Sequence, residues 1–143
     1  MRLWHQKLIP FLDNKRLLGQ HRECCALRGK GWGRKHSVVD YVFKYDLSHL
    51  YAYHSLVLNE MLKRNFRPHY QWFHRLYRGI KLDMSSLHDA GSYVSLSDTA
   101  PIYIEHDDKY LKECLLNLKE KYAQLINGQS IEHMLIDLDL KGV

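Results

Sequence analysis

The sequence contains few cysteines and no long hydrophobic run, and both shortages exclude whole classes of protein. Its 143 residues include only three cysteines, of which Cys24 and Cys25 are adjacent, so a disulfide framework is excluded. No segment approaches the roughly 18 consecutive apolar residues that a membrane span needs, and polar residues soon after Met1 interrupt any secretory signal. We therefore expect a soluble, cytoplasmic protein with reduced thiols and no membrane partner.

Complete metal-binding and nucleotide-binding motifs are also missing. Residues 21–23 have the His-x-Glu form of zinc deaminases, but no Pro-Cys-x-x-Cys follows, and the glycines of residues 29–33 do not form a P-loop. Residues 105–108, Glu-His-Asp-Asp, could bind a hard cation, but acidic residues at this place are more typical of a helix N-terminus. We predict no metal site and no cofactor.

Acidic residues are scarce in the first part of the chain. Residues 1–81 hold 16 Lys and Arg against 5 Asp and Glu, whereas residues 82–143 hold 5 against 11. A basic surface interleaved with aromatic side chains favours a polyanionic partner, because cations neutralise phosphates and release counterions. The alternative is an excess of solvated lysines and arginines without a partner.

Hydrophobic spacing predicts three main helices. The first begins at Asp13 or Asn14 and ends before Gly29, the second covers residues 47–64, and the third covers residues 107–127 with Gly128 as its C-cap. The second helix carries His54 on its apolar face, where a hydrogen-bonded core histidine is the more common case.

The remaining segments predict irregular structure and one short helix. Residues 37–45 fit a strand by composition and a helix by context, and we leave both open. Residues 67–104 form a long connection whose aromatic residues, between Tyr70 and Tyr77, either stack on bases or join the core. A short helix is expected after Ser130. The predicted fold is all-α, a compact single domain of about three main helices with long irregular loops.

Two groups carry the candidate chemistry. An α-amine has a reference pKa of about 7.7 to 8.0, so its neutral, nucleophilic fraction near neutral pH far exceeds that of lysine. Met1 is expected to be retained before the bulky Arg2, so it supplies this amine. Glu23 is an isolated acid, with nine residues before it and sixteen after it that carry no carboxylate. It either lines a pocket beside the small residues Gly19 and Ala26 or pairs with a neighbouring arginine.

Four short segments, in this order and spacing, resemble the pyrimidine-dimer DNA glycosylase family of the phage endonuclease V type. They are residues 17–23 (Leu-Leu-Gly-Gln-His-Arg-Glu), 34–36 (Arg-Lys-His), 60–66 (Glu-Met-Leu-Lys-Arg-Asn-Phe) and 77–79 (Tyr-Arg-Gly). The resemblance is clearest over residues 1–80 and continues more weakly into the third predicted helix.

The resemblance implies a metal-independent, monomeric repair enzyme that binds damaged double-stranded DNA near the nucleoid. It implies a bifunctional glycosylase and abasic-site lyase for cyclobutane pyrimidine dimers, with the Met1 amine as Schiff-base nucleophile and Glu23 as its acid–base partner in β-elimination. Contacts with DNA are implied for a set of basic residues: Arg2, His21, Arg22, Arg28, Arg34, Lys35, His36, Arg78 and Lys121.

The same reasoning divides the single domain, residues 1–143, into three parts. Residues 1–81 are the basic DNA-binding and catalytic part, residues 82–104 are an insertion loop, and residues 105–143 are an acidic helical part. Two other functions stay open: a non-catalytic DNA-binding protein, and a glycosylase and lyase of the same mechanism for another lesion. The retained Met1 and the small Ala26, where the phage enzyme has an arginine, favour the non-catalytic alternative.

Overall fold

The protein is an all-helical domain without strands in the part that the structure describes. A computed structural model describes residues 2–29, 39–92, 94, 101–121 and 124–143. The first strong element is α1 (Asn14–Arg28), which starts because the Asp13 carboxylate accepts a hydrogen bond from the Arg16 backbone N–H at 2.8 Å. It ends before Gly29, as the sequence predicted.

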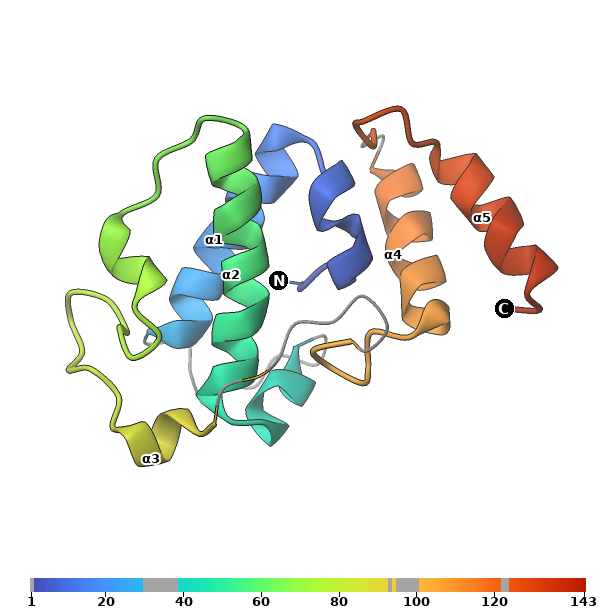
Figure 1. The fold of residues 1–143 in the computed structure, drawn as a ribbon. Coiled ribbons are helices and arrows are strands. Elements are labelled where there is room, and N and C mark those ends of the chain that lie inside the picture. Colours follow the sequence, from blue (N-terminus) through green and yellow to red (C-terminus); the bar gives the residue numbers. More distant parts are fainter. Residues whose placement is uncertain (1, 30–38, 93, 95–100, 122–123) are drawn as a thin grey trace.

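Helix α2 (Leu47–Lys63) packs along α1 and forms the centre of the domain. It ends at the predicted place, where Asn65 adopts a left-handed φ of 67° and the Phe66 N–H donates to the Met61 carbonyl at 2.9 Å. The short 3₁₀ helix η1 (Gln6–Phe11) packs against α2. In Figure 1, η1 lies between the α1 and α2 pair and the later helix α4 (Asp108–Glu120).

The third predicted helix is shorter than expected. Helix α4 covers Asp108–Glu120, whereas the hydrophobic spacing predicted a helix through residue 127. The later residues instead turn back, because the Ile126 N–H donates to the Phe11 carbonyl at 2.7 Å, and the left-handed residues Asn127 and Gly128 reverse the chain. Gly128 therefore belongs to this turn and does not cap α4. The N-terminus of α4 is as predicted, since Asp107 accepts from the Tyr110 N–H at 2.8 Å.

The expected tail helix is present as α5 (Ile131–Leu140), which covers the outer side of α4 (Figure 1). Residues 37–45 were left open between strand and helix, and the described part forms a 3₁₀ helix, η2 (Asp40–Lys44). The long connection contains the 3₁₀ helix η3 (Tyr70–Phe73) and the single turn α3 (Leu87–Ala90). Because Gly91 has a φ of 75° and an added Cβ would overlap Asp46, this turn fits closely against the start of α2.

One hydrophobic core joins these elements. Its largest fully buried side chains come from the N-terminal segment, α1, α2, the segment before α4, and α4 itself: Leu3, Leu8, Leu17, Leu27, Leu50, Tyr53, Leu58, Tyr103, Leu115 and Leu118. Among the helices that the structure describes, none combines the length and the apolar character that crossing a membrane requires.

Candidate active site

Hydrogen bonds from side chains of α1 and α2 to its backbone hold the N-terminal segment on α1. Gln20 is only 2% exposed, and its side-chain amide donates to the Arg2 carbonyl at 2.8 Å and accepts from the Trp4 N–H at 2.7 Å. The Tyr53 hydroxyl of α2 lies 2.6 Å from both the Trp4 carbonyl and the Gln20 amide oxygen. Since Glu23 follows Gln20 by three residues on the same helix, the Arg2 backbone is held at a position of α1 about one helical turn before Glu23.

Glu23 is half-buried and has an unsatisfied oxygen. Its Oε2 atom is buried and has no hydrogen-bond partner among the described residues. Within these residues, Glu23 forms no ion pair with Arg22 or Arg28. Burial of a carboxylate oxygen without a hydrogen-bond donor costs up to several kcal/mol. A donor or a proton that binds this oxygen relieves the cost. The Met1 amine predicted beside it lies outside the described residues.

The predicted DNA contact Arg2 points toward α4. Its guanidinium lies 5.8 Å from the Trp4 ring centre and 5.9 Å from that of Tyr110, which are cation–π distances. It also lies 3.6 Å from the Glu113 carboxylate, and 18% of its side chain is exposed. Helix α4 therefore forms one wall around the N-terminal segment, a contact that the sequence did not indicate.

Arg22 and Arg28 lie on the same helix in opposite environments. Arg22 is exposed, and its guanidinium extends back over Gly19, where an added Cβ would stand 3.7 Å from Nη2. Arg28 is 2% exposed and donates to the carbonyls of Trp72 at 2.8 Å, His74 at 2.8 Å and Tyr77 at 2.9 Å. Arg28 thus organises the loop over residues 72–77 from inside the domain.

Arg78 makes the return contact from that loop to α1. Its Nε donates to the Arg28 carbonyl at 2.9 Å and its Nη2 reaches the Gly29 carbonyl at 3.4 Å, where cations favour the helix C-terminus. A Cβ at Gly29 would lie 3.1 Å from the Arg78 carbonyl, so the close approach of loop and helix suits glycine. The two arginines clamp the loop to α1 from both sides.

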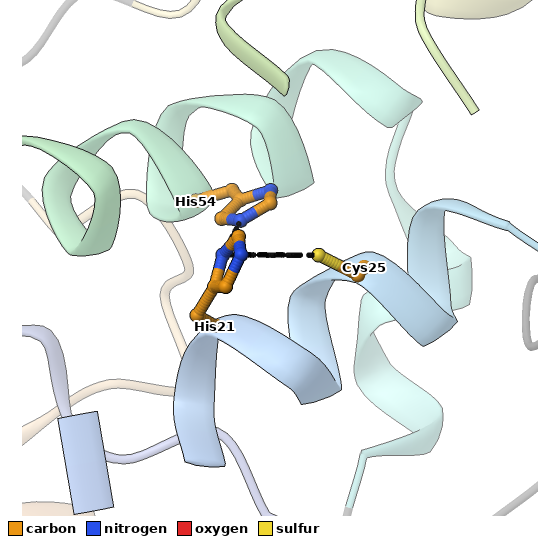
Figure 2. A group of neighbouring side chains, drawn as sticks. All are labelled: His21, Cys25 and His54. Carbon is orange, nitrogen blue, oxygen red and sulfur yellow. Dashed lines mark hydrogen bonds between the residues drawn. The ribbon is translucent and has the colours of Figure 1, made fainter. Parts of the chain in front are cut away.

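Three side chains form a group beside this clamp, the His21–Cys25–His54 cluster. His21 Nδ1 lies 2.9 Å from His54 Nε2, and Cys25 Sγ lies 3.7 Å from His21, as Figure 2 shows. The other ring nitrogen of His54, Nδ1, lies 3.0 Å from Nη1 of Arg28. His54 is fully buried and hydrogen-bonded, which confirms the core position predicted from the apolar face of its helix.

The cluster has the ligand types of a metal site, and its donor atoms lie within 4.8 Å of one another. Its surroundings oppose a cation. A metal-binding histidine normally donates its second N–H to an acceptor, whereas the second nitrogen of His54 faces a guanidinium that can only donate. Burial also raises the pKa of the Cys25 thiol to about 12, and thiolate is the form that binds metals. The described geometry therefore fits a hydrogen-bonded cluster.

A surface pocket of about 560 Å³ opens next to Cys25. Half-buried Trp72 and Tyr77 lie on its wall, whereas Tyr70, outside it, is 76% exposed, so the aromatic run divides between pocket wall and surface. The pocket is lined by residues of α1 and of the clamped loop: Cys25, Ala26, His69, Trp72, Tyr77, Arg78, Gly79, Ile80, Lys81 and Leu82.

The structure brings together only part of the predicted site. Glu23, His21, Arg22 and the anchored Arg2 lie on or beside α1, and Arg28 and Arg78 hold the neighbouring loop. Lys121 is the exposed C-cap of α4. Four predicted site residues lie outside the described residues: Met1, Arg34, Lys35 and His36.

The residues that hold the N-terminal segment were missed from the sequence. Gln20 occupies a core position of α1, with the buried Leu17 and Cys24 at helical spacing on either side. A polar amide in such a stripe is a detectable signal of a buried hydrogen-bonding role. The partner of Gln20, Tyr53 on α2, carries no comparable local signal.

Comparison with known families finds a match for the N-terminal half of the chain. A family model described as pyrimidine dimer DNA glycosylase matches residues 1–74, which contain the anchored N-terminal segment, α1 and α2. No curated protein and no solved structure matches the chain. Because this match covers more than half of its length, the chain belongs to the pyrimidine dimer DNA glycosylase family.

Proposed function

We propose that this protein is a bifunctional DNA glycosylase and abasic-site lyase that acts on cyclobutane pyrimidine dimers in double-stranded DNA. The observation that carries the proposal is the placement of the anchored N-terminal segment about one turn of α1 from Glu23, whose Oε2 is buried and unpartnered among the described residues. Family membership supports DNA repair by a glycosylase. The lyase step rests on the chemistry of these two groups.

In the proposed reaction, the neutral α-amine of Met1 attacks C1′ of the damaged nucleotide. The bond between C1′ and the base breaks, and the base leaves with one proton, which the attacking amine supplies. The bond between C1′ and the ring oxygen O4′ then breaks and O4′ takes up a proton. The product is a protonated C1′=N imine that keeps the second amine proton and stores the sugar covalently on the enzyme. Removal of a C2′ proton then expels the 3′ phosphate by β-elimination. Glu23 is the group proposed to carry the protons, since its buried oxygen has no hydrogen-bond partner among the described residues.

The surrounding cations are proposed to hold the DNA backbone. Arg22 is exposed beside Glu23 and suits a phosphate contact. Arg2, the predicted basic run at residues 34–36 and Lys121 would extend the contact. Arg28 and Arg78 are proposed to act by shaping the loop that carries Trp72 and Tyr77, whose rings suit stacking on exposed bases.

Borohydride trapping tests the nucleophile. Full-length protein incubated with a dimer-containing or abasic duplex and borohydride should give a covalent adduct that maps to Met1, and N-terminal blocking should remove it. An adduct on a lysine would overturn the assignment of the amine.

A matched pair of variants tests Glu23. Glu23→Gln should retain DNA binding, and its incision rate should fall by a factor of about 10² to 10⁴, the usual range for general acid–base groups. Glu132→Gln, an exposed carboxylate on α5, should incise like the wild type. Full activity in Glu23→Gln would remove this residue from the mechanism.

A panel of duplexes separates the remaining functions. It should carry a pyrimidine dimer, an abasic site, an alkylated base, an oxidised base or no damage. Incision at the dimer is the expected result. Incision at another base would indicate a different lesion range, and salt-dependent binding without incision of any duplex would indicate a DNA-binding protein without catalysis.

A further inference from the structure

We propose that Arg28 and His54 are positioning residues which hold His21 in one neutral tautomer, with its proton on Nε2, so that His21 contacts DNA as a directed hydrogen-bond donor without charge. The contact of His21 with DNA rests on the proposed function. The fixed tautomer rests on the geometry of the described residues alone. The inference adds a role for two buried side chains that do not reach the DNA themselves.

The first step is the bond between Arg28 and His54. A guanidinium has only donors, and Nη1 of Arg28 lies 3.0 Å from Nδ1 of His54. His54 Nδ1 must therefore carry the lone pair, and the proton of the neutral ring must be on Nε2. The other hydrogen of Nη1 is directed to the Trp72 carbonyl at 2.8 Å, so the orientation of the guanidinium is fixed by the loop as well.

The second step passes this orientation to His21. His54 Nε2 lies 2.9 Å from His21 Nδ1, and because His54 Nε2 holds the proton, His21 Nδ1 must accept it (Figure 2). The neutral His21 ring then carries its only proton on Nε2. An arginine whose charge does not vary thus determines the tautomer of a half-buried histidine through one intervening ring.

The groups that face His21 oppose its protonation. From α1 these are the cations Arg22 and Arg28 and the neutral thiol of Cys25, whose Sγ lies 3.7 Å from both ring nitrogens. From α2 it is the neutral ring of His54, and from η3 the perpendicular ring of Trp72, with the ring centres 6.4 Å apart. No carboxylate of the described residues bonds to the His21 ring. Burial, Arg22 and Arg28 lower the pKa of His21, and burial, Arg28 and His21 lower the pKa of His54.

A neutral donor has a specific consequence for binding. A protonated histidine would add a cation to the basic surface, and DNA affinity would rise as the pH falls through its pKa. A neutral His21 with Nε2–H instead gives a directional hydrogen bond to a phosphate oxygen or a base acceptor, whose strength is the same at about pH 8 and about pH 6.

Nitrogen NMR of the full chain, labelled with ¹⁵N-histidine, tests the tautomer directly. The expected spectrum shows His21 with an unprotonated Nδ1 and a protonated Nε2 at both about pH 8 and about pH 6. The His21 signals are assigned by their loss in His21→Gln. A proton on Nδ1, or a titration midpoint within that range, would overturn the proposal.

Two substitutions of His54 test the transfer. His54→Phe fills the same space but removes both bonds, so the proton of the neutral His21 ring should no longer be confined to Nε2, and the ¹⁵N signals should show Nδ1 protonated in part of the molecules. Affinity of the wild type for a duplex with a reduced abasic site should change less than about 2-fold between about pH 8 and about pH 6. His54→Gln should restore wild-type behaviour, because its amide can accept from Arg28 and donate to His21.

The matched control is His133→Phe, which removes an exposed histidine on α5. It should leave the His21 nitrogen signals unchanged. An Nε2 tautomer of His21 that persists unchanged in folded His54→Phe would overturn the proposal. If His54→Phe does not fold, the His21 tautomers of the wild type and of His54→Gln still decide the question.

A zinc titration in the same NMR experiment distinguishes the metal-site alternative. Stoichiometric Zn²⁺ binding that shifts His21 Nδ1 and His54 Nε2 would show that the cluster is a cation site, and it would overturn the proposal. Unchanged signals would support it. Absence of incision would count against the proposed function and leave the tautomer result intact, because no NMR readout depends on catalysis.

Discussion

The His21–His54 pair joins α1 to α2, and the His5–His106 pair lies just before the start of α4. Both pairs contain buried histidines, but different groups complete their hydrogen bonds. The first pair ends at the guanidinium of Arg28. The second pair is stacked at 5.4 Å, and His106 accepts from the Gln6 N–H at 3.2 Å and lies 2.7 Å from the Tyr41 hydroxyl. One pair therefore ends at a fixed charge and the other at neutral groups.

The difference in hydrogen-bond partners corresponds to the place of each pair in the molecule. The cation of the first pair needs several acceptors, and it obtains them from loop carbonyls, so it ties a surface loop and a pocket to α1. The second pair is enclosed by tyrosines and ties the N-terminal segment to the start of α4. Its burial lowers the pKa of His5 to about 4 and that of His106 to about 3. The first pair suits a binding surface, and the second suits a closed core.

Removal of the charged Arg28 side chain should have the largest effect on stability. Arg28→Met leaves three loop carbonyls and His54 Nδ1 without their donor, so the free energy of unfolding should fall by about 3 to 5 kcal/mol. Urea unfolding measures this change. Arg67→Met, at an exposed arginine, should stay within about 0.5 kcal/mol of the wild type. A loss below about 1 kcal/mol in Arg28→Met would contradict the clamp.

His106→Phe should break the hydrogen bonds of the His5–His106 pair. The free energy of unfolding should fall by about 2 to 3 kcal/mol, less than in Arg28→Met. The Gln6 N–H loses its acceptor and the Tyr41 hydroxyl loses its neighbour, whereas the ring stacking is retained. Thermal and urea unfolding measure the loss. The His21 nitrogen signals and the DNA affinity should not change in this variant. A changed affinity would mean that the two pairs are coupled.

The pH dependence of stability should also identify the second pair. A histidine whose folded pKa is lowered binds fewer protons in the native state, so its contribution is fully present above about pH 6.5 and is lost as the pH falls toward the folded value. For His106 the loss between about pH 7.5 and about pH 5 should reach about 2 kcal/mol. His106→Phe should therefore lose less stability than the wild type over this range. Equal losses would show that His106 is not kept neutral.

The smallest expected effect belongs to Tyr41→Phe. This change removes only the hydroxyl next to His106 Nε2 and should lower the free energy of unfolding by about 1 kcal/mol. Tyr70→Phe, which removes a hydroxyl from an exposed ring, provides the control and should change stability by less than about 0.5 kcal/mol. If both variants were equally stable, the Tyr41 hydroxyl would not contribute to the pair.

The sequence predicted the helices wherever local signals agree. Asp13 as an N-cap, the end of the second helix near residue 64 and the acidic start of α4 depend on neighbouring residues alone, and the structure has each of them. The predicted end of the third helix, α4, was wrong by seven residues. Hydrophobic spacing continued through Leu125, but the bond from Ile126 to Phe11 on η1 is a tertiary contact that no local pattern contains.

The candidate site divides in the same way. The sequence by itself determined that Glu23 is an isolated acid in a basic region, that His54 lies on an apolar helix face, and that the family motifs occur in order, because each depends on residue type and spacing. Only the tertiary structure decided that Arg28, predicted on the DNA-contacting surface, turns inward while Arg22 stays exposed. The reason is physical: a buried guanidinium needs several acceptors, and those of Arg28 come from carbonyls more than forty residues away in the chain.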